Sequence, residues 1–249
     1  HIHKVLADWY EAILFTGQRK SEWAQPDEKC MRLGDYHRNI FGDAYACRLL
    51  DLRVETKEKQ RLSGVRCLNV TADKVKYMWL KYRTQKNGSN GEERMYTNET
   101  GGLSFVTAMY RVMNRFRRLV PMSVDLVNPL AVHRAYTASG PVHFVTPRLI
   151  MNHMRAIAAE VFKLNPTSDK ALLRRWSTHS LRVAACVLLQ EAGFTGPQIK
   201  WLLRWCSDAF MDYLRNMPGL SVQQAMALNK VTGLMPHIFH NIRLGVMSE

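Results

Sequence analysis

Hydrophobic residues in the first part of the chain recur every three or four positions, with polar residues between them. Over residues 5–15 this spacing places the apolar side chains on one face and predicts an amphipathic helix. Thr16 and Gly17 end the pattern. A short second helix is predicted to begin before Arg19 and to end by Pro26, since proline disfavours helix in the residue before it.

A different pattern follows in the next part of the chain. Apolar and polar residues alternate over 50–55, and residues 75–82 are rich in types that favour strands. The run Asn-Gly-Ser-Asn-Gly at 87–91 is typical of a turn, and residues 94–97 match a returning strand. We therefore expect a small antiparallel sheet with a hairpin whose tip lies near 86–91.

The rest of the chain is predicted to be mostly helical. Periodic apolar residues, capping residues and boundaries at Gly or Pro indicate helices, which cover about 105–119, 146–164, 180–192, 195–203, 211–215 and 221–231. Residues 142–145 match a short strand. Together these patterns predict an α+β fold that is mainly helical and contains a small antiparallel sheet with a hairpin.

The charge of the chain is strongly unbalanced. Lys and Arg number 35 against 21 acidic residues, a formal net charge of +14 on 249 residues. This excess favours nucleic acid as a partner, with an anionic membrane surface second, and it is also consistent with a surplus that serves only solubility. Apolar residues make up 47% of the chain, enough for a sizeable core. Since no apolar run reaches the roughly 18 residues of a membrane-spanning helix, we expect no such helix.

The cysteines do not indicate a disulfide framework or a zinc site. There are five of them, an odd number, and no two have the close spacing of zinc ligands. Reduced thiols in a cytosolic or nuclear protein fit this usage best. The first residues include no Met and no signal-peptide pattern, so we expect the chain to be a piece of a longer protein.

The residues with candidate chemistry are widely separated in the sequence. His179 and Arg182 lie three positions apart near the start of a predicted helix, which places both side chains on one face. Trp205 follows Arg182 by 23 residues, and Tyr213 is the only tyrosine after it. Far upstream, the run Thr-Gly-Gln-Arg-Lys-Ser-Glu at 16–22 places an arginine just after a glycine turn.

This set resembles the catalytic domain of the tyrosine recombinases, the phage integrase family. Its order is Arg, a hairpin Lys, His-x-x-Arg, His or Trp, and Tyr, which corresponds here to Arg19, Lys86, His179, Arg182, Trp205 and Tyr213. Trp205 and the run at 213–216 resemble the Cre branch, and Gln-Lys-Asn-Gly at 85–88 resembles recombinases of Crypton- and DIRS-type eukaryotic mobile elements. The chain departs from the family in Val183 and in the 8-residue step from Trp205 to Tyr213.

The resemblance implies an enzyme that cleaves and rejoins DNA without metal, cofactor or ATP. Arg19 and Arg182 would neutralise the scissile phosphate, since guanidinium stays charged and presents a planar fork to phosphate oxygens. Tyr213 would attack phosphorus and form a 3′-phosphotyrosine intermediate. Site-specific recombination or integration is the leading hypothesis. A type IB topoisomerase-like enzyme and a domesticated, non-catalytic DNA-binding protein are the alternatives.

The remaining family positions imply supporting roles. Lys86 would protonate the leaving 5′ oxygen, although Lys81 on the same predicted strand is a second candidate. His179 would assist proton transfer or hydrogen-bond the phosphate, and Trp205 would support the site through its indole N–H. Glu22 would orient Arg19 or His179. Taken alone, each of these residues also fits an ordinary capping, packing or surface role.

Other basic residues are candidates for contacting DNA phosphates: Arg111, Arg115, Arg117, Arg118, Arg148, Arg155, Arg174, Arg175 and Arg204. The resemblance implies double-stranded DNA as the partner, a homotetramer on that DNA, and no membrane. Residues 1–216 would form the catalytic domain and 217–249 a helical tail, either exchanged between protomers or folded on its own core. A eukaryotic mobile element would place the protein in the nucleus, and any other source in the cytoplasm or nucleoid.

Overall fold

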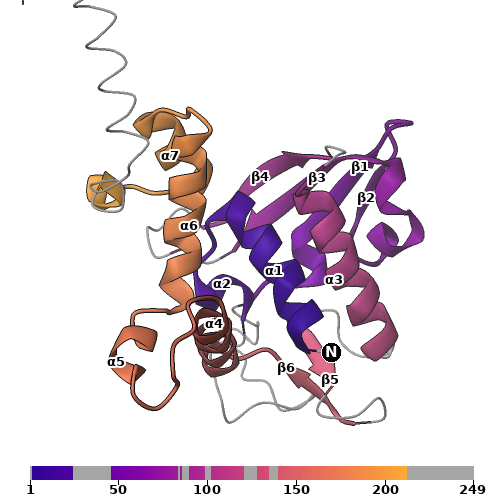
Figure 1. Cartoon of the computed structure of the whole chain (residues 1–249). Coiled ribbons are helices and arrows are strands. Elements are labelled where there is room, and N and C mark those ends of the chain that lie inside the picture. Colours follow the sequence, from indigo (N-terminus) through magenta and orange to yellow (C-terminus); the bar gives the residue numbers. More distant parts are fainter. Residues whose placement is uncertain are drawn as a thin grey trace, which may run out of the picture.

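The computed structural model describes residues 2–24, 46–83, 85, 90–98, 102–120, 128–134 and 140–211. This part of the chain is a mixed fold of helices and small antiparallel sheets (Figure 1). The predicted helix at 221–231, most of the one at 211–215, and the tail at 217–249 lie outside the described residues.

The larger sheet has the strand order β2-β1-β3-β4, and neighbouring strands are antiparallel. Its strands are β1 (Leu52–Thr56), β2 (Arg61–Ser63), β3 (Val75–Tyr82) and β4 (Glu92–Thr97). Side chains alternate between the two faces, so that Met78, Leu80 and Tyr82 of β3 are buried on one of them. This strand was predicted from residue types that favour strands, and in the structure its side chains follow the alternation of a half-buried strand.

A bulge adjusts the pairing of β1 with β3. Val54 pairs with Met78, but Thr56 pairs with Val75, so that Lys76 is the extra residue. Val75 and Thr56 are both buried, whereas Lys76 is exposed. The extra residue thus keeps the charged side chain in solvent, while Val75 and Met78 on either side of it keep their buried partners on β1.

Two long helices, α1 (Ile2–Thr16) and α3 (Phe105–Leu119), lie side by side against the sheet (Figure 1). Their buried faces join the strands in one continuous apolar core, in which Trp9 stacks on Trp23 with ring centroids 5.2 Å apart. Ser104 caps α3 by accepting a hydrogen bond from the backbone N–H of Thr107. The apolar period of these helices therefore produces the principal core of the described chain.

The later elements form a second group beside α1 (Figure 1). They are β5 (Val132–Arg134), β6 (Val142–Phe144), α4 (Pro147–Val161), α5 (Lys170–Leu173), α6 (Thr178–Glu191) and α7 (Gly196–Leu203). Helix α6 packs against both α1 and α7. A small apolar cluster joins α6 to α7 and the turn after it, and its buried members are Ala185, Cys186, Ile199, Leu203 and Phe210.

The structure corrects several predicted boundaries. The strand expected at 50–55 is preceded by a 3₁₀ turn, η1 (Leu49–Asp51), so β1 begins at Leu52. Helix α2 (Lys20–Trp23) begins after Arg19 instead of before it. Three further 3₁₀ turns are η2 (Gly64–Asn69), η3 (Ala72–Lys74) and η4 (Asp208–Phe210). The short elements β2, β5 and α5 were not predicted, because three or four residues cannot display a period.

Among the described residues, no helix combines the length and the apolar character needed to cross a membrane. The four described cysteines are free, and three of them are buried: Cys47, Cys67 and Cys186. Burial raises the pKa of the Cys67 thiol to about 11, which keeps it protonated at neutral pH.

Candidate active site

The first candidate arginine follows the end of α1. Gly17 adopts a left-handed backbone with φ +56°, and its N–H donates to the carbonyl of Ile13 at 2.7 Å. This turn ends the helix, and Arg19 then takes an extended conformation as the residue before α2. The Arg19 side chain is 31% exposed, so its guanidinium is reachable from solvent.

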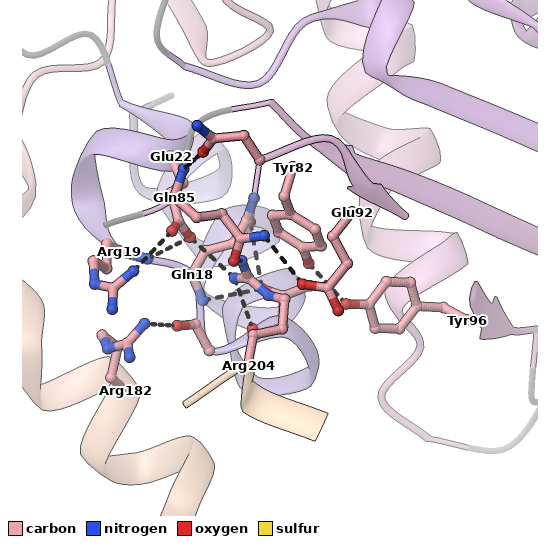
Figure 2. A network of polar contacts seen from close by, with 12 residues as sticks. Gln18, Arg19, Glu22, Tyr82, Gln85, Glu92, Tyr96, Arg182 and Arg204 are labelled. Carbon is pink, nitrogen blue, oxygen red and sulfur yellow. Dashed lines mark hydrogen bonds and ion pairs between the residues drawn. The ribbon is translucent and has the colours of Figure 1, made fainter. Parts of the chain in front are cut away.

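The Glu22 carboxylate lies at the centre of the site. One oxygen accepts from Arg19 Nη1 at 3.3 Å, and the other accepts from the Arg19 backbone N–H at 3.0 Å. The second oxygen also accepts from Arg204 Nη2 at 3.0 Å. The Glu22 side chain is only 6% exposed, so this carboxylate is a buried charge held between two cations (Figure 2).

The second candidate arginine comes from α6. Ser177 caps this helix by accepting from the backbone N–H of His179. One turn further along, buried Arg182 donates through Nη1 to the carbonyl of Gly17, 165 residues earlier in the chain. Figure 2 shows the Arg182 and Arg19 side chains beside each other. The two arginines expected to share one phosphate are therefore brought together.

Two more family positions lie beside Arg182. The guanidinium of Arg182 is 5.0 Å from the centroid of the Trp205 ring, within the range of a cation–π contact. His179 is exposed on the first turn of α6. Partial burial, together with the positive charge of Arg182, lowers the pKa of His179, so its imidazole is neutral at pH 7. Arg19, His179, Arg182 and Trp205 thus belong to one neighbourhood.

Two predicted catalytic residues, Lys86 and Tyr213, lie outside the described residues. The hairpin next to Lys86 is described in part. The Gln85 backbone N–H donates to Asn90 Oδ1 at 2.7 Å, and the N–H of Gly91 donates to the carbonyl of Tyr82 at 2.7 Å. A turn between β3 and β4 is therefore present where the sequence predicted the hairpin tip.

Arg204 is a correction to the predicted DNA-binding residues. Its side chain is 2% exposed and bonds within the protein to Glu22, Gln85 and the carbonyl of Thr16. A guanidinium in this position is not available to a phosphate on the protein surface. This burial could not be predicted from local sequence, because each partner comes from an element far away in the chain.

Arg115 is a second correction. It is buried on α3 and forms an ion pair with Asp8 of α1 at 2.5 Å. Arg111 pairs with the same carboxylate, and Arg155 donates to the carbonyl of Trp176. The other predicted DNA contacts are exposed, and they remain candidates for binding phosphates: Arg117, Arg118, Arg148, Arg174 and Arg175.

Two residues of the site were missed in the sequence. Tyr82 lies under the guanidinium of Arg204, and Gln85 accepts a hydrogen bond from it. Tyr82 has the same parity in β3 as buried Met78 and Leu80, which is a signal that its ring faces inward. Gln85 carries no such signal, because it follows the strand.

The charges of the site suit an anionic ligand. In the described part of the chain, Arg19 and Arg204 pair with the carboxylate of Glu22, and Arg182 bonds to the carbonyl of Gly17 two residues before Arg19, so positive charge is in excess (Figure 2). No cluster of three or more possible metal-ligating side chains occurs among the described residues. The arrangement can bind a phosphodiester through guanidinium groups, with a neutral imidazole close by.

No protein-family model matches this chain, and no curated protein is significantly similar to it in sequence. A functional assignment therefore depends on the side chains of the site.

Proposed function

We propose that the chain is the catalytic domain of a tyrosine recombinase, which cleaves and rejoins double-stranded DNA through a covalent 3′-phosphotyrosine. One observation carries this proposal. Four residues selected in the sequence by order and spacing, Arg19, His179, Arg182 and Trp205, lie together although they come from three segments of the chain. Chance matches to a motif have no reason to converge in space.

The two arginines supply the electrostatic part of the chemistry. Attack on a phosphodiester builds negative charge on the non-bridging oxygens of a pentacoordinate phosphorus. Arg19 and Arg182 place two permanent cations where that charge develops, and both are held before the substrate arrives. Preorganised cations of this kind need no metal ion to stabilise the transition state.

The remaining steps are proton and phosphoryl transfers. The Tyr213 hydroxyl gives its proton to the neutral imidazole of His179 as its oxygen bonds to phosphorus, while the bond from phosphorus to the 5′ oxygen breaks and Lys86 gives its proton to that leaving oxygen. Rejoining reverses the step: the 5′ hydroxyl returns a proton to Lys86 as it attacks phosphorus, and the leaving tyrosine oxygen takes its proton back from His179. The phosphotyrosine conserves the energy of the broken bond, so ATP is not needed.

DNA contact outside the site is assigned to the exposed arginines of three regions. Arg117 and Arg118 lie at the end of α3, Arg148 begins α4, and Arg174 and Arg175 follow α5. Phosphate contacts of this type position a duplex without reading its sequence and make binding dependent on salt. Assembly into a tetramer on DNA belongs to the same proposal.

The test is the formation of a covalent adduct. The protein is incubated with a pool of duplexes of randomised sequence, each nicked so that the short fragment released by cleavage diffuses away. We expect a protein–DNA adduct that survives a denaturing gel, and its loss in Tyr213→Phe. Tyr77→Phe, which removes the hydroxyl of a half-buried tyrosine on β3 that has no part in the proposed site, is the matched control and should still form the adduct.

Two results would overturn parts of this proposal. An adduct that persists in Tyr213→Phe would show that another residue is the nucleophile. Tight duplex binding with no adduct from any sequence in the pool would favour the alternative, a DNA-binding protein that keeps the site but not the chemistry.

A further inference from the structure

Arg204 has an unusual backbone for a residue with a side chain. It follows α7 directly, with φ 58° and ψ 45° in the left-handed region. Glycine adopts this conformation without strain, and any other residue is strained there. A strained backbone at an arginine with a buried side chain indicates that the contacts of the guanidinium offset the cost of the strain.

The guanidinium of Arg204 connects three separate elements. Nη1 donates to Gln85 Oε1 at 2.7 Å, and Nη2 donates to Glu22 Oε2 at 3.0 Å. Nη2 also lies 3.4 Å from the carbonyl of Thr16 at the end of α1. One side chain therefore links the hairpin after β3, the carboxylate of α2 and the last turn of α1 (Figure 2).

The plane of the guanidinium is also fixed. It lies over the Tyr82 ring, with its carbon 3.4 Å from the ring centroid, and the Tyr82 hydroxyl is 2.8 Å from that of Tyr96. Burial alone would lower the pKa of Arg204, but Tyr82 and the Glu22 carboxylate more than offset this and raise it. The side chain is thus a permanent cation with a fixed direction.

We infer that Arg204 is a positioning residue that holds Gln85 and Glu22 at once, and so couples the end of the hairpin strand to the carboxylate that orients Arg19. Gln85 is the residue before Lys86, and Glu22 is the carboxylate paired with Arg19. Arg204 therefore relates the proton donor for the leaving oxygen to a cation that binds the phosphate. This inference rests on the proposed function, and it assigns Arg204 no contact with DNA.

The chemical test uses Arg204→Gly, which removes the guanidinium and also removes the backbone strain. Lys163→Gly is the matched control, because Lys163 is an exposed residue with φ 54°. Gln85→Ala is a second variant that breaks the link from the hairpin side. Cleavage rates are measured on a duplex recovered from the adduct pool and on the same duplex with sulfur in place of the bridging 5′ oxygen.

A thiolate leaves without being protonated, so the sulfur substrate does not need the acid. We expect Gln85→Ala to cleave the oxygen substrate at least about tenfold more slowly than wild type and to recover most of that loss on the sulfur substrate. Arg204→Gly should be at least as slow on the oxygen substrate and should recover only part of its loss, because it also releases Glu22, the partner of Arg19. Lys163→Gly should match wild type on both. A Gln85→Ala variant that is equally slow on both substrates, or an Arg204→Gly variant as fast as wild type on both, would overturn the inference.

A second measurement does not depend on cleavage. Hydrogen exchange at the Gln85 and Gly91 amides reports the hairpin, since both are hydrogen-bonded there. We expect both amides to exchange faster in Arg204→Gly and to be unchanged in Lys163→Gly. Unchanged exchange in Arg204→Gly would overturn the inference even if wild type cleaves DNA. Absence of cleavage by wild type, combined with faster exchange in the variant, would overturn the proposed function and leave the link itself established.

Discussion

The core formed by α1, α3 and the larger sheet differs from the region around α6 and α7 in what holds it together. The first is one continuous set of buried apolar side chains. Within the part of the chain that the structure describes, the second has five buried apolar residues, and next to them Arg182, Arg204 and Glu22 are buried as charges. Apolar area stabilises a fold without direction, whereas buried ion pairs add little net stability but fix geometry. We therefore expect substitutions in the two regions to fail in different ways.

The largest effect is expected in the apolar core. Trp9 is almost fully buried and stacked on Trp23. Trp9→Ala should lower the free energy of unfolding by about 3–5 kcal/mol, because it removes a large apolar side chain and leaves a cavity. Cys186→Ala in the small α6–α7 cluster should cost about 1 kcal/mol, since less volume is lost. Urea denaturation measures both losses of unfolding free energy, and equal losses would contradict the expected difference between the two regions.

The next largest loss of stability is expected when a buried ion pair inside the apolar core is broken. Asp8→Ala leaves Arg115 without its partner carboxylate and should cost about 3 kcal/mol. Arg111→Ala removes a cation that pairs with the same Asp8 but is 43% exposed, and should cost less than about 1 kcal/mol. The two variants are compared by chemical denaturation. A small loss of stability in Asp8→Ala would contradict this prediction, because it would show that burying Arg115 without its carboxylate costs little.

Gly17→Ala should distinguish an effect on the stability of the fold from an effect on the geometry of the site around Arg182. The new Cβ would lie 2.9 Å from Leu203 Cδ2, and φ is +56°. Strain of this kind costs about 1–3 kcal/mol, and the Gly17 carbonyl that holds Arg182 would move as well. Gly193→Ala is the control, since Gly193 also has positive φ but open space around its Cα. Gly17→Ala should melt at the lower temperature, because only its new Cβ meets a neighbour, and adduct formation assayed where both variants are folded should be lost only in Gly17→Ala. Equal adduct formation by the two folded variants would contradict this.

The smallest expected effect is a difference in how strongly two histidines make stability depend on pH. Burial lowers the pKa of His133 in the scaffold, with a smaller contribution from His143, and partial burial and Arg182 lower that of exposed His179 in the site. A depressed pKa adds stability that is present above the unfolded value near 6.5 and is lost as the pH falls through the folded value. His133→Gln should flatten the loss of stability between pH 7.5 and 5, and His179→Gln should flatten it less, because the imidazole of His179 is exposed and its charged form is better solvated. Denaturation measured across this pH range checks the difference.

The difference between the apolar core and the region around α6 and α7 also explains which features could be predicted from the sequence. The helix Phe105–Leu119 and the strand Val75–Tyr82 were predicted at their observed boundaries, because the helix is long enough to repeat its apolar period and the strand is an unbroken run of residue types that favour strands. The contact of Glu22 with Arg19 is local, and the family resemblance implied it as one of two alternatives, the other being a contact with His179. Patterns of this kind depend only on residues close together in the chain.

The role of Arg204 could not be found in this way. The partners of its guanidinium are Gln85 and Glu22, which lie 119 and 182 residues earlier in the chain. No local pattern distinguishes an arginine that will be buried by distant elements from one that stays on a helix surface. The positions of charges in the site therefore follow from tertiary packing, whereas the scaffold follows from periodicity.

The central claim is that Arg182 neutralises charge on the scissile phosphate. It is tested most directly by comparing Arg182→Ala with wild type on a phosphodiester duplex and on the same duplex with a neutral methylphosphonate at the cleavage position. On the phosphodiester, we expect Arg182→Ala to be slower by about 10²–10³-fold, the effect of removing one preorganised donor. On the methylphosphonate the difference should shrink to less than about tenfold, because the charge that Arg182 compensates is absent. An equally large difference on both substrates would contradict the account.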